Sequence, residues 1–209
     1  MNEKYVQLFN LLEIARAQPQ YGYNVAGGNA RTGNLAEHHY LVTMIGWQLA
    51  LLAKTKGAAI DEFKVIKFCL LHDIGELFGG DIGMYYAKAN RKARTLAKAF
   101  EEENQRFLSR FFVNKLEVKM LAKEILESKS NEAHIAKIAD YLEVTHYKFF
   151  NGLMKGRDME LITPKLLEKA AKIKDDIARE EILNFIREWG DTMSGYDAFI
   201  DASADALGV

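Results

Sequence analysis

The sequence has one cysteine, two prolines and no long apolar run among its 209 residues. A single cysteine, Cys69, excludes a disulfide within the chain, and its apolar neighbours favour a buried thiol in a reducing compartment, here the cytoplasm. No apolar run approaches the roughly 20 residues that a membrane-spanning helix needs. The first five residues also lack the basic and then apolar layout of a signal peptide.

A large excess of one charge sign is also missing, because 28 basic residues nearly balance 29 acidic ones and the formal net charge is −1. This balance gives no electrostatic reason to expect a nucleic-acid or membrane partner. The sequence is 49% hydrophobic, which is enough to bury a substantial core. Its length fits a single domain that covers residues 1–209.

Apolar residues recur at three- and four-residue spacings along most of the chain, the pattern of amphipathic helices. We expect helices over about 3–17, 34–56, 61–78, 84–112 and 115–127, another that begins after 131, and a last one over 163–189 with Pro164 in its first turn. No segment has a convincing strand pattern. The sequence therefore predicts an all-α fold with a core at about 5–150 and a C-terminal helical extension at 155–209.

One stretch combines a strongly apolar run with several ionisable residues. His72 and Asp73 stand side by side at its end, Glu76 follows four residues after His72, and Asp81 comes just after two glycines. Burial of such groups is costly unless a partner satisfies them. A divalent metal ion is such a partner, since it takes both imidazole and carboxylate ligands. If the helix continues, Glu76 shares a face with His72 and lies beside the metal site.

Two further residues complete this pattern. His38 lies one turn before Leu41 and Val42 on the apolar stripe of the helix at 34–56, and Asp140 lies inside an apolar segment. Each alone is more typical of a hydrogen-bonded core histidine or a capping aspartate. Together with His72 and Asp73 they come from three helices and face inward. Two imidazoles and two carboxylates can hold a transition metal and leave positions for water and substrate.

The spacing of these residues resembles that of the HD-domain metal-dependent phosphohydrolases. Residues 31–38 (RTGNLAEH), 72–81 (HDIGELFGGD) and 137–143 (KIADYLE) are similar to the three sequence motifs of its small 5′-deoxynucleotidase group. The resemblance covers roughly residues 5–150 and implies an HD-domain helical bundle with an additional C-terminal helix. It also implies a homodimer and a small nucleotide as the substrate.

The resemblance further assigns roles to individual residues. It implies that a divalent ion, such as Mn²⁺ or Co²⁺, is bound by His38, His72, Asp73 and Asp140. It implies that Glu76 and Asp81 orient or deprotonate the attacking water and protonate the leaving alkoxide. Arg31 and Lys88 are expected to hold the phosphate, arginine by its bidentate fork and lysine as a point charge.

The chain departs from its relatives in the loop before the first motif. Many relatives carry a Pro-Arg-x-Gly-Trp segment there, whereas this chain has PQYGY at 19–23. Gln20 replaces an arginine that would contact phosphate, and Tyr23 replaces a tryptophan near the sugar. Both are expected to bind substrate, because glutamine can hydrogen-bond and tyrosine can stack on a base or close off a ribose 2′-oxygen.

Two alternatives to a deoxynucleoside 5′-monophosphatase remain open on the sequence alone. The altered loop with Gln20 and Tyr23 and the basic run from Lys88 to Lys98 leave room for a triphosphohydrolase that releases tripolyphosphate, although such a run is more typical of a solvated helix face. A non-catalytic nucleotide-binding module that keeps the metal for stability is the other alternative. Glu76 and Asp81 argue against it, because a purely structural site has no need of further carboxylates beside the metal.

Overall fold

A computed structural model describes residues 2–21, 33–154 and 158–193. Within these ranges the chain is helical and forms no strand beyond an isolated bridge between Pro19 and Asn34. This confirms the predicted all-α fold. The elements are α1 (Glu3–Leu12), the 3₁₀ helix η1 (Glu13–Arg16), α3 (Leu35–Thr55), α4 (Glu62–Leu71), the 3₁₀ helix η2 (Ile74–Phe78), α5 (Met84–Ala89), α6 (Arg91–Ser109), α7 (Lys115–Glu127), α8 (Asn131–Phe150), α9 (Asp158–Ala170) and α10 (Asp176–Met193).

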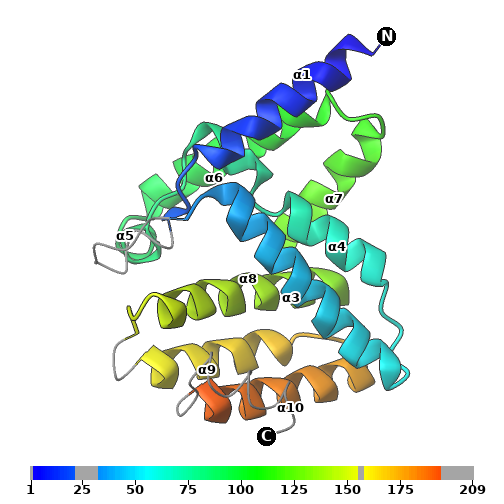
Figure 1. The fold of residues 1–209 in the computed structure, drawn as a ribbon, viewed down its shortest axis with the longest axis vertical. Helices are drawn as coiled ribbons and strands as arrows, with labels where there is room; N and C mark the ends of the chain where they lie inside the picture. The colour runs from blue at the N-terminus through cyan, green and yellow to red at the C-terminus, as the bar shows by residue number, and fades with distance from the viewer. Residues whose placement is uncertain (1, 22–32, 155–157, 194–209) are drawn as a thin grey trace, which may run out of the picture.

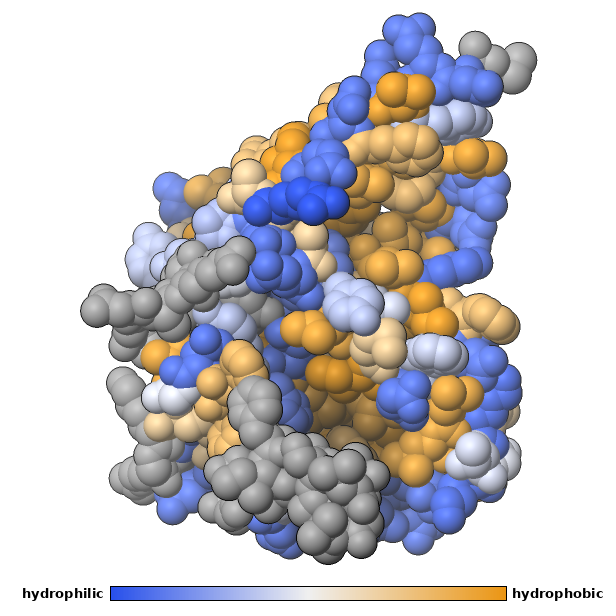
Figure 2. Space-filling view, viewed as in Figure 1, coloured by the Kyte–Doolittle hydropathy of each residue, from blue (hydrophilic) through white to orange (hydrophobic). Residues whose placement is uncertain are grey.

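The core lies where α3 packs against α4 and α8. Figure 1 shows α8, α9 and α10 stacked in the lower half of the molecule with α3 crossing in front of them, and α1, α6 and α7 in the upper half. Fully buried side chains from the three central helices include Val42, Phe68 and Leu142. Apolar residues also reach the surface on this face (Figure 2). Among the exposed apolar side chains of the molecule is Phe9 of α1, which is 62% exposed. No helix in the described ranges has the length and apolar character to span a bilayer.

The start of α3, predicted near residue 34, is fixed by a capping box. The Asn34 side chain accepts a hydrogen bond from the Glu37 backbone amide (3.0 Å), and the Glu37 carboxylate accepts one from the Asn34 amide (3.3 Å). Such a reciprocal pair satisfies two free amides of the first turn. His38 is the next residue and is fully buried. Leu41 was expected on the same inward-facing stripe, but it is 44% exposed.

The helix expected over 61–78 is shorter than predicted. It begins where predicted, with Asp61 as its cap, but α4 ends at Leu71 and the chain continues as η2. Close packing explains the change of path: a Cβ atom at Gly75 would lie 2.6 Å from the backbone oxygen of Glu101 in α6. The prediction that His72 and Glu76 share one α-helical face is therefore wrong.

Two other long helices were wrongly predicted as continuous. The segment at 84–112 breaks at Asn90, whose side chain accepts a hydrogen bond from the Ala93 amide (3.0 Å) and caps α6. The segment at 163–189 consists of α9, with Pro164 inside it rather than in its first turn, and α10. Asp175 caps α10 by accepting a hydrogen bond from the Ala178 amide (2.8 Å). In both cases a short polar side chain offers the backbone an alternative to continuing the helix.

Candidate metal centre

The four predicted metal ligands lie together in the structure. His38 sits in the first turn of α3, His72 and Asp73 directly follow α4, and Asp140 lies in the middle of α8. Since α3 packs against both α4 and α8, residues that are far apart in the sequence meet at one point. Both histidines are buried, and the two aspartates open to the surface on one side.

The donor atoms of these residues converge closely. The Nε2 atoms of His38 and His72 are 3.1 Å apart. Asp73 Oδ2 lies 3.3 Å from His72 Nε2 and 3.5 Å from His38 Nε2. Asp140 Oδ1 is 3.5 Å from His38 Nε2 and 4.0 Å from His72 Nε2. One donor atom each from His38, His72 and Asp73 fits within 4.8 Å, so these three residues form a group that can hold a metal ion.

Hydrogen bonds at the far side of each ring determine which nitrogen faces the centre. His72 Nδ1 lies 2.8 Å from the Cys69 carbonyl oxygen, which can only accept, so this nitrogen carries the proton. His38 Nδ1 lies 2.7 Å from Glu143 Oε2, and it likewise carries the proton that the carboxylate accepts. In the neutral rings both Nε2 lone pairs then point at each other and at two carboxylates. That arrangement is repulsive on its own and fits a divalent cation.

The pKa values of residues around the centre also indicate an excess of negative charge that a cation would neutralise. Burial lowers the pKa of His38, but hydrogen bonds to Asp73 and Glu143 and the charge of Asp140 outweigh it and raise the pKa to about 10. Burial and the charges of Asp73 and Asp81 raise the pKa of Glu76 to about 11. Burial and the charge of Asp73 raise the pKa of Asp81 to about 6. So many close carboxylates are stabilised by a cation.

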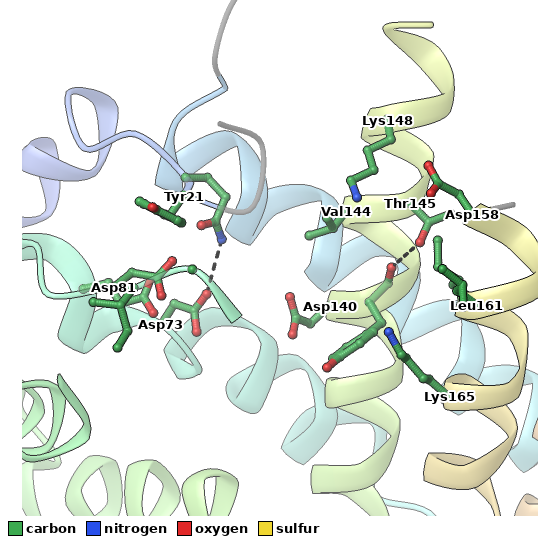
Figure 3. Close-up of a pocket in the computed structure, with 16 residues that line it drawn as sticks. Tyr21, Asp73, Asp81, Asp140, Val144, Thr145, Lys148, Asp158, Leu161 and Lys165 are labelled. Carbon is green, nitrogen blue, oxygen red and sulfur yellow. Dashed lines mark hydrogen bonds between the residues drawn. The ribbon is translucent and has the colours of Figure 1, made fainter. Parts of the chain in front are cut away.

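A pocket of about 350 Å³ opens beside this centre. Asp73, Glu76, Asp81 and Asp140 line its metal-side wall, and Lys148 and Lys165 lie across it (Figure 3). The volume falls in the range of small-molecule binding sites. The pocket can therefore place a small ligand against the metal ligands and the two further carboxylates at once.

The predicted substrate-binding residues are placed unevenly. Gln20 is buried at the pocket, and its Nε2 donates a hydrogen bond to Asp73 Oδ2 (3.4 Å). Lys88 is exposed on α5, and the structure does not bring it to the pocket wall. Arg31 and Tyr23 lie outside the described residues. The aromatic side chains that do line the pocket are Tyr21 and Tyr141.

Several pocket and centre residues were missed by the sequence reasoning. Glu143 follows Asp140 by three residues inside the third motif, so its spacing gave a signal that was not used. Lys148 follows Asp140 by eight residues in α8, a spacing that was not used, whereas Lys165 had no signal of its own, because only the packing of α9 on α8 brings it to the pocket. His39, next to His38, is half-buried, and its buried Nε2 atom has no hydrogen-bond partner among the described residues.

Comparisons with known proteins agree with this fold and centre. A family model described as HD domain matches residues 23–184. The structure is similar to a conserved hypothetical protein from Pyrococcus furiosus, with a TM-score of 0.67 and 24% identity over 88% of this chain and 99% of that one. It is also similar to the PH0347 protein from Pyrococcus horikoshii OT3, with a TM-score of 0.66 and 22% identity over 88% and 98%.

No curated protein gives a significant match to the sequence. The two structural similarities support the fold. The family match supports membership of the family itself, because it spans most of the chain and contains all four converging residues. Members of this family are generally metal-dependent hydrolases. The chain belongs to the HD-domain family.

Proposed function

We propose that this protein is a metal-dependent phosphohydrolase that converts deoxynucleoside 5′-monophosphates to nucleoside and phosphate. The observation that carries this proposal is the convergence of two imidazole Nε2 atoms, 3.1 Å apart, with the Asp73 and Asp140 carboxylates at the wall of a pocket of about 350 Å³. The choice of a deoxynucleoside monophosphate rests on the resemblance of residues 31–38, 72–81 and 137–143 to the 5′-deoxynucleotidase motifs.

In this proposal the centre holds one divalent ion through His38, His72, Asp73 and Asp140. Such an ion lowers the pKa of water and neutralises charge on a phosphoryl group. Glu76 and Asp81 line the same pocket without belonging to the His-His-Asp group. They are placed to take a proton from the attacking water and to return one to the leaving alkoxide. Gln20, held against Asp73, takes the position of the arginine found in relatives and donates to a phosphate oxygen.

Of the two features that left room for the triphosphohydrolase alternative, the altered loop with Gln20 and Tyr23 remains, and the basic run carries less weight. The basic run that motivated it lies on exposed positions of α5 and α6, and Lys98 pairs with Glu102 there (3.8 Å). The non-catalytic alternative is separated from both enzymes by experiment, since it predicts thermal stabilisation by nucleotides without any turnover.

A product assay tests the proposed function. The purified protein is incubated with Mn²⁺ or Co²⁺ and a panel of ribo- and deoxynucleoside mono- and triphosphates, and orthophosphate and tripolyphosphate are both measured. Orthophosphate from the deoxynucleoside monophosphates is the expected result. Tripolyphosphate from a triphosphate would instead establish the triphosphohydrolase.

The metal-dependent mechanism has its own test. Asp73→Ala removes the carboxylate shared by both imidazoles, so activity is expected to fall at least about 100-fold, with loss of bound metal. Metal content is measured alongside activity. Full activity of this variant at unchanged metal content would overturn the mechanism.

A further inference from the structure

The pocket extends well beyond the metal centre, onto α8 and α9. Its far wall is formed by Val144, Thr145 and Lys148 of α8 and by Leu161, Ile162 and Lys165 of α9. In Figure 3, Asp73 and Asp81 lie on one side of Asp140, and Lys148 and Lys165 lie on the other. No motif residue falls on this wall, so the resemblance to known enzymes gives it no role.

The spacing along α8 gives the length of the pocket. Asp140, Val144 and Lys148 follow one another at four-residue intervals and so share one face of the helix. Eight residues at a rise of ~1.5 Å place Lys148 about 12 Å from Asp140 along the helix axis. A phosphoryl group at the metal centre therefore leaves room for a nucleoside-sized group before the lysine is reached.

The pocket-lining residues of α9 are also spaced at helical intervals. Asp158, Leu161, Ile162 and Lys165 are spaced three or four residues apart, so α9 presents one continuous strip to the pocket. Leu161 is 54% exposed even though it lines the cavity. An apolar surface of this kind, with ammonium donors beside it, suits a flat heterocycle that carries hydrogen-bond acceptors on its edge.

Another lysine already lies closer to the carboxylates of the centre. Burial lowers the pKa of Lys137, while Asp140, Asp73 and Glu101 act in the opposite direction through their charges. Lys137 precedes Asp140 by one turn of α8, whereas Lys148 follows it by two. Lys137 does not line the pocket, whereas Lys148 and Lys165 do, so among the described residues these two are the lysines that a bound substrate meets.

We propose that the α8–α9 wall is a nucleobase subsite, in which Leu161 and Ile162 pack against the base and Lys148 and Lys165 donate hydrogen bonds to its edge. An ammonium group on this wall can donate to the O6 and N7 acceptors of guanine, whereas adenine presents an amino donor at the 6-position. The subsite therefore selects a 6-oxopurine over a 6-aminopurine. This inference rests on the proposed function, because it assigns the base end of a nucleotide whose phosphate lies at the metal.

The test compares deoxyguanosine 5′-monophosphate, deoxyadenosine 5′-monophosphate and the base-free ester 2-deoxyribose 5-phosphate. Each is assayed with the wild type, Lys148→Met and Lys165→Met, and with Lys172→Met as a control at an exposed lysine that pairs with Glu168 outside the pocket. Methionine keeps an unbranched stem but removes the donor. The wild type is expected to favour the guanine nucleotide at least about tenfold in kcat/KM, and each pocket variant to lose about tenfold on that substrate alone.

Each remaining outcome has a definite meaning. An equal loss on 2-deoxyribose 5-phosphate would assign the lysines to the phosphate and overturn the subsite, as would no loss on any substrate. Calorimetric binding of the two purine nucleotides to the same proteins tests the wall even without turnover, and equal affinities in wild type and variants would also overturn it. If the wild type hydrolyses none of the esters but discriminates the two purines in binding, the proposed hydrolysis fails and the subsite stands.

Discussion

Glu143 shows how one buried side chain can set up the whole centre. Its carboxylate is only 2% exposed and lies 2.7 Å from His38 Nδ1. A carboxylate in this position keeps the proton on Nδ1, directs the Nε2 lone pair to the centre and holds the ring in place. Glu143 thus acts on the metal through His38, as a positioning residue.

Replacement of Glu143 by glutamine tests this role. Glu143→Gln keeps the size of the side chain but removes the negative charge that stabilises the His38 ring against a cation. We expect the dissociation constant for Mn²⁺ to rise about 10- to 100-fold. Calorimetric titration of metal-free protein measures it, with Glu188→Gln at an exposed position of α10 as the control. Unchanged metal affinity in Glu143→Gln would show that Glu143 has only a packing role.

The sequence could predict the residues of the centre better than those of the pocket. His38, His72, Asp73 and Asp140 share a spacing pattern, so they could be grouped before their positions in space were known. The pocket wall has no such pattern. Lys165 belongs to it only because α9 packs back onto α8, and packing between distant segments is not encoded in local periodicity.

At the scale of elements, the contact between η2 and α6 positions Glu76. Gly75 lies directly against α6, and its carbonyl oxygen accepts a hydrogen bond from Asn104 Nδ2 (2.7 Å). A Cβ atom there would come within 2.6 Å of the Glu101 carbonyl oxygen, which is part of a helix backbone and cannot turn away. The absence of a side chain at Gly75 therefore allows η2 to carry Glu76 into the pocket.

Gly75→Ala is accordingly expected to destabilise the protein. Forcing a methyl group into this contact should lower the free energy of unfolding by about 1–3 kcal/mol. It should also reduce activity, since Glu76 moves with η2. Urea denaturation and the orthophosphate assay measure the two effects. Glu102→Ala, on the exposed side of α6, serves as the control and should change stability by less than about 0.5 kcal/mol. Wild-type stability of Gly75→Ala would show that η2 is not tightly held.

The junction between α8 and α10 contains a pH-sensitive hydrogen bond. Trp189 Nε1 donates to His146 Nε2 (2.9 Å), which requires the imidazole to be neutral at that nitrogen. Burial lowers the pKa of His146 below its ordinary value of 6.5, and the charge of Glu143 only partly offsets this. Below pH 6.5 the unfolded chain therefore takes up this proton more readily than the folded protein.

This linkage predicts the direction of a pH effect on stability. The contribution of His146 is fully present above pH 6.5 and is lost as the pH falls through the lower pKa of the folded state. His146→Gln keeps an acceptor for Trp189 but cannot titrate. We expect the wild type to lose stability relative to this variant between pH 7 and pH 5, measured by thermal unfolding. A stability difference that does not change with pH would contradict the linkage.

The errors in predicting the helices have a common physical origin. Periodicity identified the apolar faces on both sides of Asn90 and Asp175, but α5 ends at Ala89 and α9 at Ala170, and the side chains of Asn90 and Asp175 cap the helices that follow. A cap is one polar residue in a pattern otherwise read over many positions, so it is easily taken for part of the polar face. Where the cap coincided with a clear change in composition, as at Asn34 and Asp61, the predicted boundary was confirmed.

For the molecule as a whole, the centre connects the three helices that build the core. His38 lies in the first turn of α3, His72 and Asp73 directly follow α4, and Asp140 lies within α8, so a bound ion would connect these elements at one point. The unfolded chain has no such arrangement of ligands. Metal binding and folding are then linked, and the ion contributes to global stability as well as to chemistry.

This linkage predicts that Mn²⁺ stabilises the fold and that a chelator reverses the effect. At a free-ion concentration about 1,000 times the dissociation constant, the gain is about 4 kcal/mol. For a domain of this size that corresponds to a rise of about 10 °C in Tm. Asp73→Ala should show no comparable rise, because one ligand of the His-His-Asp group is missing. A wild-type Tm that stays constant while calorimetry detects Mn²⁺ binding would mean that the ion binds the folded and the unfolded chain equally well, which would contradict a site assembled by the packing of α3, α4 and α8.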